Sequence, residues 1–315
     1  MNQIKGRCKL EFYNPSDTSK IMKNIIADLN GTLVFRTQDP KNFSLIFNRI
    51  IPWYRSVESG EEVKSPFLSL LVNNSGQFFR IVKDLEQRWS EFCKTLRESG
   101  FILEEFEGEC EWRMVVGLGG VHPYETSMTL HHVYGVPYIP GSALKGVTRH
   151  YGLSLFAVEC VNKGVMTDYY KCIGQLDDQL CKGEFSEKFR DIFVLRDIGF
   201  SDLIAIFGDT EDRGNICFLD AFPIGGIKLE IDIINTHYQD YYSGKQPPAD
   251  WQTPVPVKFL TLGRQSKFKF AVCARKGKES KVNSVLLNKA IRLLKGALTS
   301  FGVGAKTSLG YGLFR

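Results

Sequence analysis

The chain has 315 residues, of which 43% are hydrophobic and 24% charged, a composition typical of globular proteins with a sizeable core. Its 40 basic and 35 acidic residues leave a net charge of +5, which by itself does not identify a nucleic-acid binder. No apolar run approaches the roughly 20 residues of a membrane span, and the first residues lack a signal peptide's apolar stretch. We therefore expect a cytoplasmic protein with no membrane partner.

The first 110 residues are predicted to form a mainly helical N-terminal extension, residues 1–110. Between Phe78 and Leu96, apolar residues recur at alternating spacings of three and four, as on one face of an amphipathic helix. Gly100 supplies a stop for this helix. The segment "NFSLIFNRII" favours a second helix, which ends before Pro52.

From Trp112 onward the pattern changes. "WRMVVGL" (112–118) alternates between apolar and other residues as a strand does, and a helix is predicted to follow the prolines and glycines near Gly141. Residues 154–206 show no clear period, and we interpret them as an insertion with short helical pieces.

The last third contains strands and a second helix. Strands are predicted over 215–223 and 227–234, and residues 256–274 are predicted as an added hairpin with its turn at 263–266. Residues 283–301 are predicted to form an amphipathic helix. Three cations of this helix lie off its apolar stripe: Lys289, Arg292 and Lys295.

The order over residues 111–315 is therefore strand, helix, strand, strand, helix, strand, which is the ferredoxin-like arrangement. We expect an α+β fold with a ferredoxin-like core, in which helices cover one face of an antiparallel sheet. The other face would be free to meet a ligand.

The start of the first core helix carries the first candidate site. Pro140 and Gly141 precede Ser142, which is the predicted N-cap. Lys145 and Arg149 are four residues apart and share a face. Cations near a helix N-terminus oppose the helix dipole, so this pair indicates either a seat for an anion such as a phosphate or a tolerated solvated face.

The glycine-rich loop near the end of the sequence is the second candidate. Four glycines surround Lys306 and Ser308, and they allow positive φ angles and close approach of a ligand. The loop is not a P-loop, because it lacks the G-K-[ST] tripeptide and follows a helix. It fits a phosphodiester backbone or a tight turn equally well. The glycines are Gly302, Gly304, Gly310 and Gly312.

Histidines, cysteines and acidic residues give weaker signals. His131 and His132 are adjacent and would point to opposite faces of an extended chain, although histidine is a common acid or base in metal-free RNA cleavage. The eight cysteines show no C-x-x-C pair, so scattered apolar side chains are favoured over a zinc site built on Cys160, Cys172 and Cys181. The acidic turn 209–212 indicates either a cation site or a solvated turn. We expect no metal and no cofactor.

Several motifs resemble those of RAMP proteins from CRISPR interference complexes. The segment "IPGSALKG" and the terminal glycine loop are RAMP-like, and the block "HYQDYYSGKQPPADWQTPVPV" is similar to the sixth-subunit family of the Cmr, type III-B, complex. The resemblance extends over about residues 110–315 and is carried by the segments 117–146, 207–223, 235–260 and 302–312.

The resemblance implies a non-catalytic RNA-binding subunit near the crRNA 3′ end, without cofactors. Its implied partners are crRNA, target RNA, other Cmr RAMP subunits and the small helical subunit. The loop Thr126–His132 would protrude toward RNA. Matching RNA-contact positions are His132, Lys145, Gly146, Arg149, Gly302, Gly304, Lys306, Ser308 and Gly310.

Two alternatives remain beside this interpretation. One is a crRNA-processing endoribonuclease of the Cas6 kind, which would use His122 or His132 as its acid or base. The other is an assembly protein that makes no RNA contact.

Overall fold

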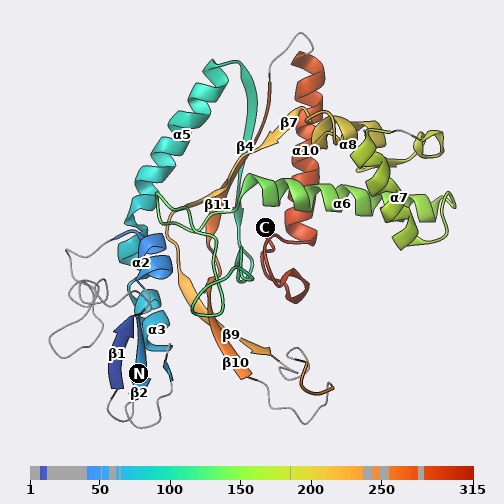
Figure 1. Ribbon diagram of the computed structural model, residues 1–315. Helices are drawn as coiled ribbons and strands as arrows, with labels where there is room; N and C mark the ends of the chain where they lie inside the picture. The colour runs from blue at the N-terminus through green and yellow to red at the C-terminus, as the bar shows by residue number, and fades with distance from the viewer. Residues whose placement is uncertain are drawn as a thin grey trace. The chain divides into compact units, whose positions relative to one another are not determined.

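The computed structural model describes residues 8–12, 41–50, 52–56, 62–63, 65–184, 186–236, 244–247, 255–275 and 280–315. The chain forms two compact units, each assembled from three separate stretches. Unit 1 contains Met1–Val82, Val115–Pro137 and Gly225–Ser266; unit 2 contains Lys83–Met114, Tyr138–Ile224 and Lys267–Arg315. The sequence predicts two parts that follow one another, residues 1–110 and 111–315. Instead, each unit combines segments that are far apart in the sequence (Figure 1).

Unit 1 contains two small antiparallel sheets and short helices. One sheet has the order β1–β2–β3, and β9 pairs with β10 in the other. Helix α3 packs on β9 and β10. We did not predict the strands of the first 63 residues, so this part is less helical than expected. The elements are β1 (Cys8–Phe12), α2 (Phe43–Arg49), β2 (Pro52–Ser56), β3 (Glu62–Val63), α3 (Ser65–Asn73), α4 (Ser75–Phe78), η1 (Phe79–Ile81), β9 (Leu229–Thr236) and β10 (Val255–Leu262).

Unit 2 is built on a larger antiparallel sheet. Strand β11 lies between β4 on one side and β7 and β8, one after the other, on the opposite side. The chain end runs along the free side of β4, where Glu109 and Arg315 exchange both backbone hydrogen bonds and Cys110 pairs with Phe314. The strands are β4 (Phe101–Glu109), β7 (Ile216–Phe218), β8 (Phe222–Ile224) and β11 (Lys267–Arg275).

The first strand of this sheet was predicted in the wrong place. It is β4, whereas residues 112–118 form no named strand. The sequence of β4, "FILEEFEGE", is rich in glutamate and does not alternate cleanly. These charges are tolerated because Glu105 and Glu109 form ion pairs with Lys269 and Lys267 on the neighbouring strand.

The hairpin predicted over residues 256–274 is also wrong in its pairing. Both strands exist, as β10 and β11, but β10 pairs with β9 and β11 pairs with β4, β7 and β8. A local pattern predicts where strands lie more reliably than which strands they pair with.

Helices cover both faces of the sheet in unit 2. Phe106 and Phe270 stack on the face toward α6 (Gly141–Asn162) and α10 (Ser280–Ser300), which pack on each other. The other face, expected to be free, meets α5 (Val82–Glu98). Its Trp89 ring lies 5.4 Å from that of Phe222, and its Arg97 donates to Glu105 at 2.6 Å.

The insertion of unit 2 begins later than predicted, because α6 continues to Asn162. It contains α7 (Tyr169–Lys182), η2 (Glu187–Phe189), β5 (Phe193–Val194), β6 (Ile198–Gly199) and α8 (Phe200–Phe207). None of the helices in the ranges given above has the length and hydropathy needed to cross a membrane.

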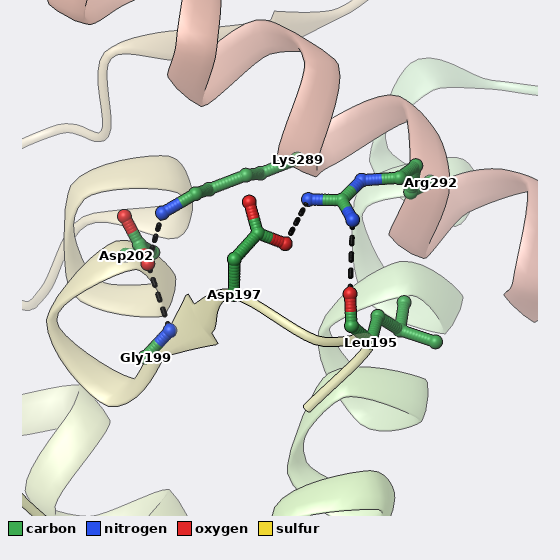
Figure 2. Close-up of polar contacts among 6 residues, drawn as sticks. All are labelled: Leu195, Asp197, Gly199, Asp202, Lys289 and Arg292. Atoms are coloured by element: carbon green, nitrogen blue, oxygen red, sulfur yellow. Dashed lines mark hydrogen bonds and ion pairs between the residues drawn. The ribbon is translucent and has the colours of Figure 1, made fainter. Parts of the chain in front are cut away.

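Two off-stripe cations of α10 anchor this insertion (Figure 2). Lys289 Nζ donates to Asp202 Oδ2 at 2.7 Å, and the same oxygen accepts from the Gly199 backbone N–H at 2.8 Å. Arg292 donates to Asp197 Oδ1 at 2.5 Å and to the Leu195 carbonyl at 2.9 Å. These cations therefore hold the β5–β6 turn and the start of α8 against α10.

The start of α6 depends on a close backbone contact. A Cβ on Gly141 would overlap the backbone carbonyl of Phe218 in β7, so only glycine fits there. Asp220 Oδ1 accepts a hydrogen bond from the Gly141 N–H at 2.7 Å. The predicted N-cap, Ser142, is instead an exposed residue within the helix, because Pro140 occupies the cap position.

Substitution of two glycines in α6 tests this packing. We expect Gly141→Ala to lower the free energy of unfolding by about 2 kcal/mol, because the methyl group must displace β7 or the helix. Gly146→Ala is the matched control: no atom lies within 4 Å of its Cβ position, and alanine favours helix by about 1 kcal/mol. Urea unfolding of both variants measures the difference. Equal stabilities would contradict the contact with Phe218.

Candidate nucleic-acid interface

The N-terminus of α6 already has an anion beside it. The carboxylate of Asp220 accepts the first helical N–H, so it occupies the position where a helix dipole would favour a bound phosphate. Asp220 lies within residues 215–223, which were predicted as one strand, but it falls in the break between β7 and β8. A phosphate held at this end of the molecule would therefore bind through side chains of α6 beyond its first turn.

The predicted pair of cations on α6 divides into two different roles. Arg149 forms an ion pair with Asp177 of α7 and lies 3.2 Å from Cys181 Sγ, so it ties α6 to α7. Lys145 is half-exposed and forms no ion pair with any residue that the structure describes. Gly146, beside it, is exposed and has open space around it. Lys145 and Gly146 are thus the accessible part of the predicted site.

The terminal loop, residues 302–312, is closed on itself by backbone contacts. Val303 N–H donates to the Gly312 carbonyl at 2.9 Å, and Gly312 N–H donates to the Arg113 carbonyl at 2.8 Å. A side chain on Gly312 would overlap Val303, and Gly302 lies similarly close to Tyr311 and Gly312. These two glycines are therefore required by the turn itself.

The tip of the terminal loop is open. Gly304 and Ser308 are exposed, and Gly304 and Gly310 have positive φ angles of 102° and 89°. Lys306 also has a positive φ, 62°, which is unfavourable for a residue with a Cβ. The closed base and the exposed tip show that the tight turn and the accessible glycine loop, posed as alternatives, are parts of one structure.

Helix α6 meets the start of this loop through aromatic side chains. Tyr151 packs edge-on against Phe301 with ring centroids 5.3 Å apart, and His150 lies at 5.5 Å from the same ring. Arg149 is directed to α7 instead. The terminal loop and α6 therefore belong to one packed region of unit 2.

The histidines of unit 1 are arranged differently from our expectation. The rings of His131 and His132 stack with centroids 5.5 Å apart, so they do not point to opposite faces. The prediction fails because this segment turns sharply: Gly135 N–H donates to the His131 carbonyl. His132 is exposed, and its backbone carbonyl accepts from the Asn42 side chain at 3.2 Å.

His122, the other candidate acid or base, has both ring nitrogens engaged. Its Nδ1 accepts the Tyr124 N–H at 3.1 Å, so Nε2 carries the proton and donates to the Phe47 carbonyl at 3.0 Å. Its ring also stacks on Phe47 at 4.4 Å. This geometry is that of a histidine holding a loop in place.

The candidate metal ligands do not converge within the ranges that the structure covers, where no group of three or more His, Cys, Asp or Glu side chains is placed to hold a metal ion. Burial raises the pKa of the Cys160 thiol to about 12, and it also raises the pKa of Cys172. In the acidic turn, the Asp212 and Glu211 N–H groups donate to Asp209, and these bonds lower its pKa.

Comparison with known proteins identifies the family. A model of the RAMP superfamily matches residues 109–315. The CRISPR system Cmr subunit Cmr6 of Pyrococcus furiosus is 35% identical to this chain over 96% of the chain and 92% of its own length. The chain belongs to the RAMP superfamily and, within it, to the Cmr6 family. The resemblance drawn from the sequence motifs is confirmed.

Two more distant proteins extend the comparison with the Cmr6 family. The CRISPR system CMR subunit Cmr6 of Saccharolobus solfataricus is 23% identical over 81% of this chain and 72% of its own. A chain in the cryo-EM structure of the type III-B Cmr-beta bound to cognate target RNA matches with a TM-score of 0.53 and 20% identity. This match covers 80% of the present chain and 72% of the other, and it supports a shared fold.

A double-mutant cycle tests the structural role of Arg149. Because the pair with Asp177 is partly exposed, we expect Arg149→Ala and Asp177→Ala each to lower the free energy of unfolding by less than about 1 kcal/mol. The double variant should lose little more than either single variant, since the two residues act together. Urea unfolding measures all three. Fully additive losses would contradict the pairing.

Proposed function

We propose that this chain is a non-catalytic, RNA-binding subunit of a type III-B CRISPR effector complex. The observation that carries this proposal is its 35% identity, over nearly the full length of both chains, to a protein named as a Cmr subunit. The match to a chain in a Cmr structure that contains target RNA supports the same assignment at the level of fold. We further propose a position near the crRNA 3′ end, beside other Cmr RAMP subunits and the small helical subunit, in the cytoplasm.

We also propose that unit 2 has the ferredoxin-like core of a RAMP protein. The chain visits β4, α6, β7 with β8, β11, α10 and the terminal bridge at Phe314 in that order. Across the sheet, the order is terminal segment, β4, β11 and then β7 with β8, all antiparallel. Both the connections and the spatial order match a β-α-β-β-α-β arrangement, interrupted by the α7–α8 insertion and by the part of unit 1 that follows β8.

RNA would be held mainly through its phosphates. The tip of the terminal loop contains the exposed residues Gly304 and Ser308 and the cation of Lys306. On α6, Lys145 supplies a second cation beside Gly146, whose missing side chain permits a polyanion to approach the helix backbone. Phosphate contacts of this kind bind without reading sequence.

The non-catalytic part of the proposal rests on the side chains that would have to react. His122 is fixed by bonds at both ring nitrogens, and burial raises the pKa of Cys93 and Cys110 to about 11. At neutral pH these thiols stay protonated and are poor nucleophiles. His132 is exposed, and its ring stacks on that of His131 with centroids 5.5 Å apart.

Incubation of the full chain with CRISPR repeat RNA in metal-free buffer tests this absence of catalysis. We expect intact RNA, because no fixed acid–base pair faces solvent at His122. Specific cleavage that is lost in His132→Ala would overturn the proposal and favour a Cas6-like endoribonuclease.

Two substitutions test the proposed phosphate contacts. We expect Lys145→Ala and Lys306→Asn each to weaken binding of a single-stranded RNA about fivefold and to reduce the salt slope of log affinity by about 0.7. Asparagine tolerates a positive φ, so Lys306→Asn removes the charge without straining the loop. Lys171→Ala, an exposed cation of α7, is the matched control and should leave affinity unchanged. Equal affinity and slope for all four proteins, measured by fluorescence anisotropy, would contradict these contacts.

A further inference from the structure

A row of cations and aromatic rings lies beside the terminal loop. Arg113 Cζ lies over the Trp112 ring, 5.4 Å from its centroid, and the Trp112 ring meets Tyr311 edge-on at 4.9 Å. Lys306 Nζ in turn lies over the Tyr311 ring at 5.3 Å. We call these four residues the Trp112 cluster. Each of its two rings has one cation over it, Arg113 over Trp112 and Lys306 over Tyr311.

The position of Trp112 is fixed by backbone bonds on both sides of it. Glu111 N–H donates to the Leu313 carbonyl at 2.9 Å, and the Arg113 carbonyl accepts from Gly312 N–H at 2.8 Å. The next residue, Met114, is buried. Tyr311 is only 2% exposed, and its ring packs against the indole at an interplanar angle of 67°. The indole is therefore a rigid aromatic plane at the surface, since Trp112 itself remains half-exposed.

Residues of the terminal loop leave this ring accessible. The Cβ position of Gly310 lies 4.0 Å from Trp112 Cε3, so a larger side chain there would extend over the indole. Leu309 and Ser308 next to it are exposed, and Lys306 holds its unfavourable φ of 62° within the same turn. Backbone strain of this kind persists where the surrounding structure enforces it, and it often marks a binding site.

We propose that Trp112 is a stacking site for one unpaired RNA base, with Arg113 and Lys306 contacting the phosphates on either side of that nucleotide. This inference rests on the proposed RNA-binding function and adds a base contact to the phosphate contacts. A half-exposed indole with Arg113 over its ring, and with Lys306 over the neighbouring Tyr311 ring, matches the alternation of base and phosphate in single-stranded RNA. Stacking of this kind tolerates any base, because every base has a π face. Glu111 is a neighbouring carboxylate, and Glu109 beside it is paired with Arg315.

The test compares two labelled oligomers of equal length, a single-stranded RNA and its counterpart in which the bases are removed, by fluorescence anisotropy with the full chain. We expect Trp112→Leu to weaken binding of the RNA about tenfold and to leave binding of the abasic oligomer and the salt slope unchanged. Trp112→Phe keeps an aromatic face and should recover most of the affinity. Lys306→Asn should weaken binding of both oligomers.

The outcomes separate this inference from the proposed function. If the wild-type chain binds neither oligomer, the RNA-binding function is wrong, and the stacking site with it. If the wild type binds both and Trp112→Leu changes neither affinity, or changes both equally, only the stacking site is overturned. It is also overturned if Trp112→Leu keeps its RNA affinity but no longer binds a neighbouring protein subunit in the purified complex.

Intrinsic tryptophan fluorescence of the wild-type chain and Trp112→Phe is a second measurement of stacking, which does not require Trp112→Leu to fold. RNA should quench tryptophan emission of the wild-type chain, and Trp112→Phe should abolish most of that quenching. Undiminished quenching in Trp112→Phe would overturn the stacking site.

Discussion

Charge pairing along β4 is the interaction on which unit 2 depends. This strand lies between β11 and the chain end, and its glutamates meet cations from three directions: Lys267 and Lys269 from β11, Arg315 from the terminus and Arg97 from α5. Burial alone would raise the pKa of Glu105, but hydrogen bonds from Arg97 and Lys269 lower it, so the carboxylate stays charged. An acidic strand can therefore occupy the middle of a sheet. The helices on both faces and the terminal loop are positioned by it.

The same pairing places the candidate interface. Because the chain end runs along β4, residues 313–315 bring the terminal loop back to the segment after β4, where Trp112 and Arg113 lie. Gly312 joins both parts, since it bonds to Val303 and to Arg113. Lys306 and Trp112 are far apart in sequence, and this connection brings them into one cluster. The candidate site therefore forms because the terminal segment is the sheet neighbour of β4.

Features with local causes were predicted well from the sequence. The helices predicted over 78–96 and 283–301 are present because the apolar period that defines each of them lies within its own segment. Features with distant partners were missed. Strand β4 is acidic and lies within residues 1–110, which were predicted to be mainly helical, and its cations come from other elements. The carboxylate that caps Gly141 comes from Asp220, 79 positions later. In β11, Lys267 and Lys269 pair with glutamates of β4 and the rings of Phe268 and Phe270 are buried, so its alternating cations and rings belong to a core strand. Arg149 was predicted to share a phosphate site or a solvated face with Lys145, whereas it forms an ion pair with Asp177 of α7. The motifs of the glycine loop did indicate the family, because the close contacts at Gly302 and Gly312 allow no other residue.

RNA contact by the terminal loop is tested most directly within the assembled complex. Guide RNA containing 4-thiouridine can be photo-crosslinked to the purified type III-B assembly that contains this chain, and the modified peptides identified by mass spectrometry. We expect crosslinks in residues 302–312 and at Trp112 or Arg113. Crosslinks that map to other subunits and leave both segments of this chain unmodified would contradict the account.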